Sequence, residues 1–240
     1  MIQSNHSAPV HSTQTTPHPR LAEYVRRHLQ NEWRQAPGRP TVEAFEAVNR
    51  DVSVTTQKLV LDSGCGNGES TRLIGRHYPD CLVIGVDKSA ARLQKVCSGT
   101  FPHREENVIW LRAELAGFWQ LAMQAGWQLH RHFLLYPNPW PKPGQLMRRW
   151  HAHPVFPAML KLGGRLEMRC NWDIYAMEFA AAIKTASGFE AGVEPSVDSA
   201  ITTPFERKYR NSGHGLYTVR TPDLGAALTS RSPQFPIAMK

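Results

Sequence analysis

An acid and three glycines come close together between residues 62 and 68, where the chain reads Asp-Ser-Gly-Cys-Gly-Asn-Gly. The segment follows the apolar run Lys58 to Leu61 and precedes a helical pattern, which puts the glycines in a turn from a strand to a helix. Since glycine has no Cβ, the backbone of such a turn can bend tightly and approach a ligand closely. The pattern predicts a loop that binds a nucleotide or a nucleoside.

The residues around this loop separate two kinds of nucleotide site. A dinucleotide-binding loop prefers Gly-x-Gly-x-x-Gly, whose third glycine would fall on position 69, but the chain has Glu69 there. Asp87 ends the next apolar run, Cys81 to Val86, where a carboxylate can accept hydrogen bonds from both hydroxyls of a ribose. We therefore expect an adenosine ligand.

The acid followed by Gly-x-Gly-x-Gly resembles the first motif of class I methyltransferases, which implies S-adenosylmethionine as the cofactor. Glu114 follows the third apolar run, where this superfamily places an acid near the adenine amino group. The alternative interpretation is a glycine-rich turn beside ordinary surface acids. The residues expected to bind the cofactor are Asp62, Gly64, Gly66, Gly68, Asp87, Lys88, Glu114 and Asn138.

A loop rich in proline, Tyr136 to Lys142, follows the fourth apolar run. Because ligands of open α/β sheets bind at the carboxyl ends of the strands, we expect this loop to face the transferred methyl group. Trp140 offers a flat face on which a base could stack, or alternatively packs beneath the loop. The basic residues Lys142, Arg148 and Arg149 either contact phosphates or form a solvated basic surface.

Apolar runs that alternate with helical patterns must position these residues. Strands are predicted at 58–61, 81–86, 108–111, 132–136, 165–170 and 216–219, and the alternation favours a parallel α/β sheet with crossover helices. Ahead of them, helical spacing predicts helices over 21–33 and 41–49. We expect a disordered tail over 1–19, a helical extension over 20–50, a methyltransferase domain over 51–222 and a C-terminal tail over 223–240.

Charge and composition restrict the partners and the compartment. The 240 residues carry 28 Lys and Arg against 20 Asp and Glu, a formal charge of +8, which suits a nucleic acid partner but also a merely basic protein. The four cysteines include no Cys-x-x-Cys pair, and no apolar run is long enough to cross a membrane. No acid or cysteine cluster completes a metal site around the histidine pairs at 130/132 and 151/153. We expect a cytoplasmic monomer without a metal.

Further motifs resemble those of the tRNA (guanine-N7)-methyltransferases. Pro137 to Trp140 is similar to Pro-Asp-Pro-Trp in that family, and Asn171-Trp172-Asp173-x-Tyr175 resembles its Thr-Asp-Trp-Glu-x-Tyr segment. The turn at 162–166, the Thr-x-Phe-Glu motif at 203–207 and the Gly-His at 213–215 extend the resemblance over 58–219. It implies a Rossmann-like, seven-stranded, mostly parallel sheet with an antiparallel last strand and helices on both faces. It also implies S-adenosylmethionine as methyl donor and a guanine of tRNA as acceptor.

Asn138 and Asn171 stand where the family has acids. Guanine N7 has an in-plane lone pair, so its methylation needs no base to remove a proton, but the product ring is cationic. A carboxylate can bind the N1 and N2 donors of guanine and stabilise the developing charge, whereas an asparagine brings no charge. Loss of such a carboxylate typically costs ~2.7–4 kcal/mol. We therefore expect slow, altered or absent transfer.

Three functions remain open from the sequence. One is tRNA guanine-N7 methylation. Another is methylation of adenine N6 or cytosine N4, because the amino-methyltransferases carry a similar Asn-Pro-Pro-aromatic motif, and a third is a protein that binds cofactor and RNA without catalysis. For the first, the resemblance implies catalytic roles for Asn138, Asn171, Thr203 and Glu206, and substrate binding by Trp140, Lys142, Arg148, Arg149, Asn171, Arg207 and Lys208.

Overall fold

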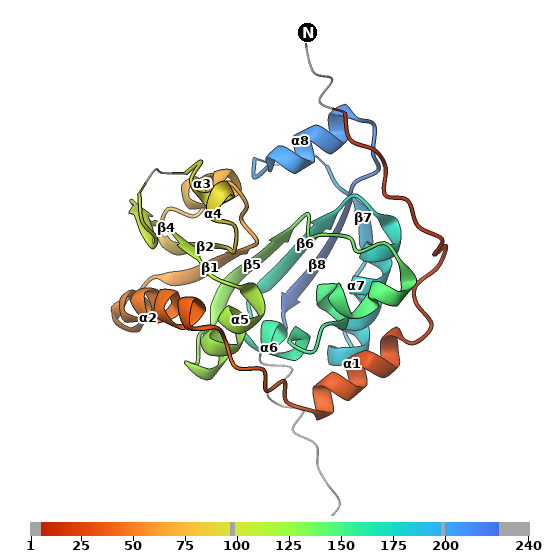
Figure 1. Ribbon diagram of the computed structural model, residues 1–240, viewed down its shortest axis with the longest axis horizontal. Helices are drawn as coiled ribbons and strands as arrows, with labels where there is room; N and C mark the ends of the chain where they lie inside the picture. Colours follow the sequence, from red (N-terminus) through yellow and green to blue (C-terminus); the bar gives the residue numbers. More distant parts are fainter. Residues whose placement is uncertain (1–5, 97–98, 198–199, 226–240) are drawn as a thin grey trace, which may run out of the picture.

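An eight-stranded sheet runs through the computed structural model, which describes residues 6–96, 99–197 and 200–225. The strand order is β3-β4-β2-β1-β5-β6-β8-β7 (Figure 1). The strands are β1 Lys58–Ser63, β2 Cys81–Asp87, β3 His103–Glu105, β4 Val108–Arg112, β5 Leu129–Leu135, β6 Arg165–Cys170, β7 Val193–Pro195 and β8 Tyr217–Asp223. The central pairs from β4 to β6 are parallel, and β8 is antiparallel to β6 and β7. The mostly parallel fold with an antiparallel last strand is therefore confirmed.

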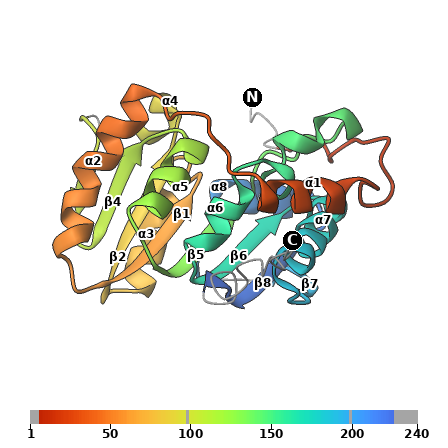
Figure 2. The ribbon, with the colours of Figure 1, turned by 90° about the horizontal axis from the view of Figure 1, so that it is seen from below.

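Helices cover both faces of this sheet (Figure 2). They are α1 Leu21–Gln30, α2 Arg39–Val54, α3 Glu69–His77, α4 Ala90–Leu93, α5 Leu115–Gln124, α6 Phe156–Lys161, α7 Asp173–Ser187 and α8 Pro204–Asn211, with 3-10 helices η1 Pro143–Arg148 and η2 Trp150–Ala152. Among the described residues, no helix has the length and apolar character needed to span a membrane.

Alternation along the strands divides the core in two, because successive side chains of a strand point to opposite faces. Leu59 and Leu61 of β1 belong to a large cluster with residues of α1, α2, α5, α6 and α7. Val60, between them, belongs to a smaller cluster that includes Ile74 of α3 and Leu93 of α4. The two helices ahead of β1 therefore pack into the same core as the sheet, through Val25 and Phe45 among others.

The sheet has one strand more than the seven expected. The additional strand is β3, which pairs antiparallel with β4 at the edge of the sheet. Its three residues, His-Arg-Glu, contain no apolar position, so the alternation that reveals a half-buried strand is missing. The short β7, Val-Glu-Pro, is exposed along its length, and three residues are too few to show an alternating pattern.

The N-terminal segment differs from the disordered tail that its composition predicts. Residues 6–19 run in an extended path from the end of α8, along α7, to the start of α1 (Figure 1). The segment has few apolar anchors, and hydrogen bonds hold it instead: Gln14 and His18 both donate to Glu178 of α7. Composition measures the apolar surface a segment can bury, and it does not reveal polar partners far along the chain. Residues 226–240 of the expected C-terminal tail lie outside the described residues.

Candidate active site

A cleft of about 540 Å³ opens at the carboxyl ends of β1, β2 and β5. This is the edge at which open α/β sheets bind ligands, because their loops leave a crevice there. Both predicted segments meet in this cleft, the glycine turn through Gly64 and the proline-rich loop through Pro137 and Pro139. The predicted site residues that line it are Gly64, Asp87, Lys88, Glu114, Asn138, Trp140 and Arg148.

The glycine turn divides into two parts with different requirements. Gly64, Gly66 and Gly68 all have positive φ angles, which strongly favour glycine. A Cβ on Gly66 would meet nothing within 4 Å, so the absence of a side chain there leaves open space beside the turn. A Cβ on Gly68 would lie 2.5 Å from Nε1 of Trp110, whose indole also donates to the carbonyl of Gly68. The first two glycines thus form a cradle, while the third permits close packing.

Asp62 lies beneath the turn with an unused acceptor. Its carboxylate is 1% exposed, and Oδ2 accepts hydrogen bonds from the hydroxyls of Ser70 and Thr71, each at 2.8 Å. Oδ1 is buried and has no hydrogen-bond partner among the described residues. Burial raises the pKa of Asp62 to about 6, although the two hydroxyls oppose that shift. A buried, unsatisfied carboxylate oxygen fits an amino group or a water molecule delivered with a ligand.

Asp87 joins the turn to the neighbouring strand. Its Oδ2 accepts from the amide of Gly66 at 3.0 Å and its Oδ1 from the amide of Ser89 at 2.8 Å. Arg92 lies 3.6 Å from Oδ2. A carboxylate has about four acceptor positions, so both oxygens keep capacity for a diol such as a ribose.

Glu114 is held in place by helix α5, which it caps. Its two carboxylate oxygens accept from the amides of Ala116 and Gly117, and its own amide donates to Thr41 of α2. This arrangement satisfies two of the free amides at the helix start. It brings an acid to the end of the cleft nearest β4, and the glycine cradle, Asp62, Asp87 and Glu114 together fit an adenosyl cofactor.

The proline-rich loop enters the cleft in a strained conformation. Tyr136 and Trp140 have φ angles of 53° and 46°, a region that residues with a side chain rarely adopt. Asn138 is exposed, and its Oδ1 accepts from the amide of Trp140 at 3.4 Å. The guanidinium of Arg148 lies 4.8 Å from the centre of the Trp140 ring. Trp140 lines the cleft, which favours a stacking surface over packing beneath the loop.

Arg149 does not contact solvent, so the expectation that it binds phosphate is wrong. Its side chain is fully buried and forms an ion pair of 2.6 Å with Glu178, also fully buried. It donates to the carbonyl of Trp140 at 3.1 Å, and its guanidinium lies over the ring of Trp172. A guanidinium so placed organises the loop from beneath.

Three of the four residues expected to be catalytic are not among those that line the cleft. The amide of Asn171 donates to Nδ1 of His214 at 3.2 Å. The hydroxyl of Thr203 caps α8 by accepting from the amide of Glu206. Glu206 is itself 1% exposed and paired with Arg169 at 3.0 Å and with Arg210 at 3.1 Å. In this structure Thr203 and Glu206 hold the start of α8, and direct contact with a base stays a prediction for all three.

The basic residues expected to bind RNA differ in their exposure and in their ion-pair partners. Arg207 pairs with Glu69 at 2.6 Å and so ties α8 to the start of α3. Lys142 is exposed beside the loop, and Lys208 is half-buried on α8. Arg148 alone of this group lines the cleft.

Comparison with known protein families identifies the family of this chain. Residues 56–219 match a family described as a putative methyltransferase. The chain belongs to this methyltransferase family. The match begins just before β1 and ends within β8, so it covers the glycine turn, Asp87 and the Trp140 loop.

Two bacterial methyltransferases are similar to this methyltransferase over most of their length. It is 29% identical over 170 residues to the tRNA (guanine-N(7)-)-methyltransferase of Saccharophagus degradans, covering 67% of this chain and 73% of the relative. It is 28% identical over 185 residues to the enzyme of the same name from Acidithiobacillus ferrooxidans, covering 70% and 77%.

Solved methyltransferase structures have the same fold as this methyltransferase. A structure of an antibiotic-related methyltransferase superposes with a TM-score of 0.54 at 13% identity, over 74% of this chain and 94% of that one. A 16S rRNA methyltransferase superposes with a TM-score of 0.52 at 16% identity, over 75% and 93%. At such identities the likeness concerns the fold.

Aromatic residues of α8 and of the segment after Arg148 complete the cleft of the methyltransferase; of these, only Phe205 belongs to a motif that the sequence singled out, and none was predicted to bind cofactor or substrate. Phe205 and Tyr209 line it from α8, and Trp150 and His153 from the segment after Arg148. Phe205 is 42% exposed. Residues four apart share one face of a helix, so the spacing of Phe205 and Tyr209 was the available signal.

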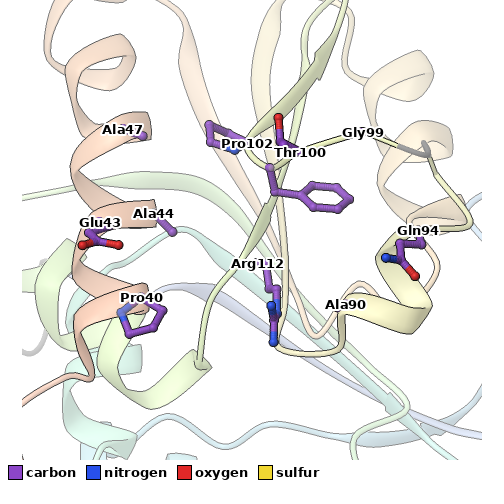
Figure 3. A pocket seen from close by; sticks show the side chains of 11 residues that line it. Pro40, Glu43, Ala44, Ala47, Ala90, Gln94, Gly99, Thr100, Pro102 and Arg112 are labelled. Atoms are coloured by element: carbon purple, nitrogen blue, oxygen red, sulfur yellow. The ribbon is translucent and has the colours of Figure 1, made fainter.

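A second hollow of about 480 Å³ lies away from the glycine turn (Figure 3). Side chains of α2, including Glu43 and Ala47, face Gln94 and Arg112 across it. None of the predicted site residues lines it. The cleft at the strand ends is therefore the candidate active site.

Proposed function

We propose that this methyltransferase transfers the methyl group of S-adenosylmethionine to N7 of a guanine in tRNA. The observation that carries the proposal is that Gly64 and Asp87 line the same cleft as Asn138 and Trp140. A cofactor on the first pair and a base on the second would have their reacting groups side by side in one cleft. The similarity to two tRNA (guanine-N(7)-)-methyltransferases supports guanine N7 and tRNA, and the formal charge of +8 suits an RNA partner.

The donor side of the cleft has a group for each part of the cofactor. The open cradle at Gly64 and Gly66 would admit the methionine portion, and the unpartnered Oδ1 of Asp62 would accept a hydrogen bond from its ammonium group, directly or through a water. Asp87 would accept from the ribose hydroxyls and Glu114 would lie beside the adenine. S-adenosylmethionine supplies a methyl group bonded to a cationic sulfur, which a lone pair can attack.

The acceptor side supplies a stacking surface and a hydrogen-bond acceptor. Trp140 would stack on the guanine, and the amide oxygen of Asn138 would accept from N1 or N2 of the base. No residue needs to remove a proton, since N7 carries its lone pair in the plane of the ring. Arg148, beside Trp140, would contact a phosphate.

The proposal is tested by nucleoside analysis. The protein is incubated with S-adenosylmethionine and unmodified tRNA, the RNA is digested, and methylated nucleosides are identified by mass spectrometry, with one of the relatives as a positive control. We expect 7-methylguanosine. N6-methyladenosine or N4-methylcytidine would replace the proposal with an amino-methyltransferase. Binding of cofactor and tRNA without any methylated nucleoside would indicate a protein that binds without catalysis.

The missing charge at position 138 has its own test. If the cationic product ring needs a carboxylate, Asn138→Asp should raise kcat by a factor on the order of 10² to 10³. Gln57→Glu adds the same charge at an exposed position just before β1, at the opposite edge of the sheet, and should change nothing. An equal rate for both variants would contradict a role for charge at residue 138.

A further inference from the structure

The N-terminal segment 7–18, which we call the N-terminal strap, hydrogen-bonds to the loop that carries Trp140 and to the end of α8. The hydroxyl of Ser12 donates to the carbonyl of Pro141 at 2.5 Å. At the other end of the strap, the carbonyl of Ser7 lies 2.9 Å from Nε2 of His214, the imidazole whose Nδ1 accepts from Asn171. The strap is thus bonded to the loop that carries Asn138 and, through His214, to Asn171.

A buried ion pair fastens the middle of the strap. Oε1 of Glu178 accepts from the side chain of Gln14 at 2.6 Å and from the amide of His18 at 2.9 Å. Its other oxygen binds Arg149, which in turn donates to the side-chain oxygen of Gln14 at 3.0 Å. Gln14 therefore satisfies both members of the pair, as buried charges require.

The same guanidinium holds the loop. Besides Glu178 and Gln14, Arg149 donates to the carbonyls of Trp140 at 3.1 Å and Lys142 at 3.4 Å. A guanidinium has five donors in a fixed plane, so the positions of its partners are coupled. The strap and the loop are joined through one rigid group that is fully buried.

The conformation of the loop needs such support. Tyr136 and Trp140 have positive φ angles, and side-chain-bearing residues keep that conformation only where surrounding contacts impose it. Ser12 and Arg149 donate to the carbonyls of three successive residues of the loop, from Trp140 to Lys142. Gln14 supports these contacts indirectly, because its side-chain oxygen accepts from Arg149.

We propose that the N-terminal strap is a positioning element for the methyl acceptor, and that Ser12 and Gln14 hold the Trp140 loop in the conformation that binds the base. The inference rests on the proposed function. The strap leaves the cofactor side untouched, because its hydrogen bonds go to the loop, to α7 and to the residues that follow α8.

The test uses the full chain with Ser12→Ala and Gln14→Ala combined. Both side chains are half-buried. Without Gln14, Arg149 and Glu178 keep their ion pair, and Glu178 keeps its contacts with the amide of His18 and with His151, so the variant should fold. We expect kcat/KM for tRNA to fall on the order of 10- to 100-fold, because a displaced base reacts more slowly. The Kd for S-adenosylhomocysteine should not change. Thr15→Ala, at an exposed position of the strap, is the matched control. Ser12→Thr keeps the hydroxyl and should retain the activity that Ser12→Ala loses.

Two outcomes would overturn the inference while the proposed function stands. One is an unchanged kcat/KM for tRNA in the double variant. The other is a loss of cofactor affinity as large as the loss of kcat/KM for tRNA, since the strap would then act on the whole fold. If the wild-type chain methylates no RNA, the proposed function fails, and amide hydrogen exchange over 136–142 tests the strap alone. Faster exchange in the double variant supports the strap's role, and equal exchange contradicts it.

Discussion

The backbone amide of Gly66 donates to Oδ2 of Asp87 at 3.0 Å, and this bond joins the glycine turn after β1 to the end of β2. Neighbouring parallel strands end at the same edge of the sheet, so two segments separated by helix α3 meet there. The turn and the acid expected to bind ribose are therefore one unit, and changes in either should affect cofactor binding.

Asp87→Asn should weaken cofactor binding by about 10- to 100-fold, because hydrogen bonds to a charged group contribute ~1.5–3 kcal/mol. Asp80→Asn, exposed just before β2 at the other end of that strand, should leave the affinity unchanged. Calorimetric titration with S-adenosylhomocysteine measures both. Equal affinities for the two variants would remove Asp87 from the site.

Gly66→Ala should weaken the same binding through the backbone. The φ angle of Gly66 is 62°, and an alanine there costs ~1–2 kcal/mol, while its Cβ would intrude into the open cradle. Gly192→Ala is the matched control, since a Cβ there also meets nothing within 4 Å but no positive φ is involved. We expect a lower affinity and a lower melting temperature for Gly66→Ala alone, and a Gly66→Ala protein that binds normally would contradict the cradle.

Cofactor affinity should depend on pH through Asp62. Burial raises the pKa of this acid to about 6, so its carboxylate is charged above pH 6 and protonated below it. Only the charged form favours a ligand ammonium group, and affinity should fall as the pH drops through 6. Asp62→Asn removes the titrating group and should flatten this profile. The measurement is the Kd for S-adenosylhomocysteine from pH 5 to 8, and a profile that is equally steep in Asp62→Asn would assign the titration to another group.

Trp140→Ala should impair the acceptor side alone. Stacking of a base on an aromatic ring contributes ~1–3 kcal/mol, so KM for tRNA should rise by about 10- to 100-fold while cofactor affinity stays constant. Trp140→Phe keeps an aromatic face and should lose less. Steady-state kinetics with tRNA and a cofactor titration separate the two sides. If Trp140→Ala and Trp140→Phe behave alike, stacking is not what Trp140 provides.

Strands with a clear apolar pattern could be predicted from the sequence, whereas short polar ones could not. The run Arg165 to Cys170 coincides with β6, and the five other predicted strands overlap observed ones. β3 and β7 exist because a neighbouring strand offers free hydrogen-bonding groups, and no property of their own residues requires them. Hydrophobic periodicity reports burial, so an exposed strand escapes it.

The sequence by itself determined the turn that needs glycine at its three positive φ angles, because that requirement depends on local backbone geometry. It also determined the acids at the ends of β1 and β2, because each lies within or directly after an apolar run. The tertiary structure alone decided which of two adjacent arginines faces the cleft. Arg148 lines it, whereas Arg149 is buried against Glu178 of α7, twenty-nine residues further along the chain. Adjacent residues of one type look alike locally, and only the packing of a distant charge separates their roles.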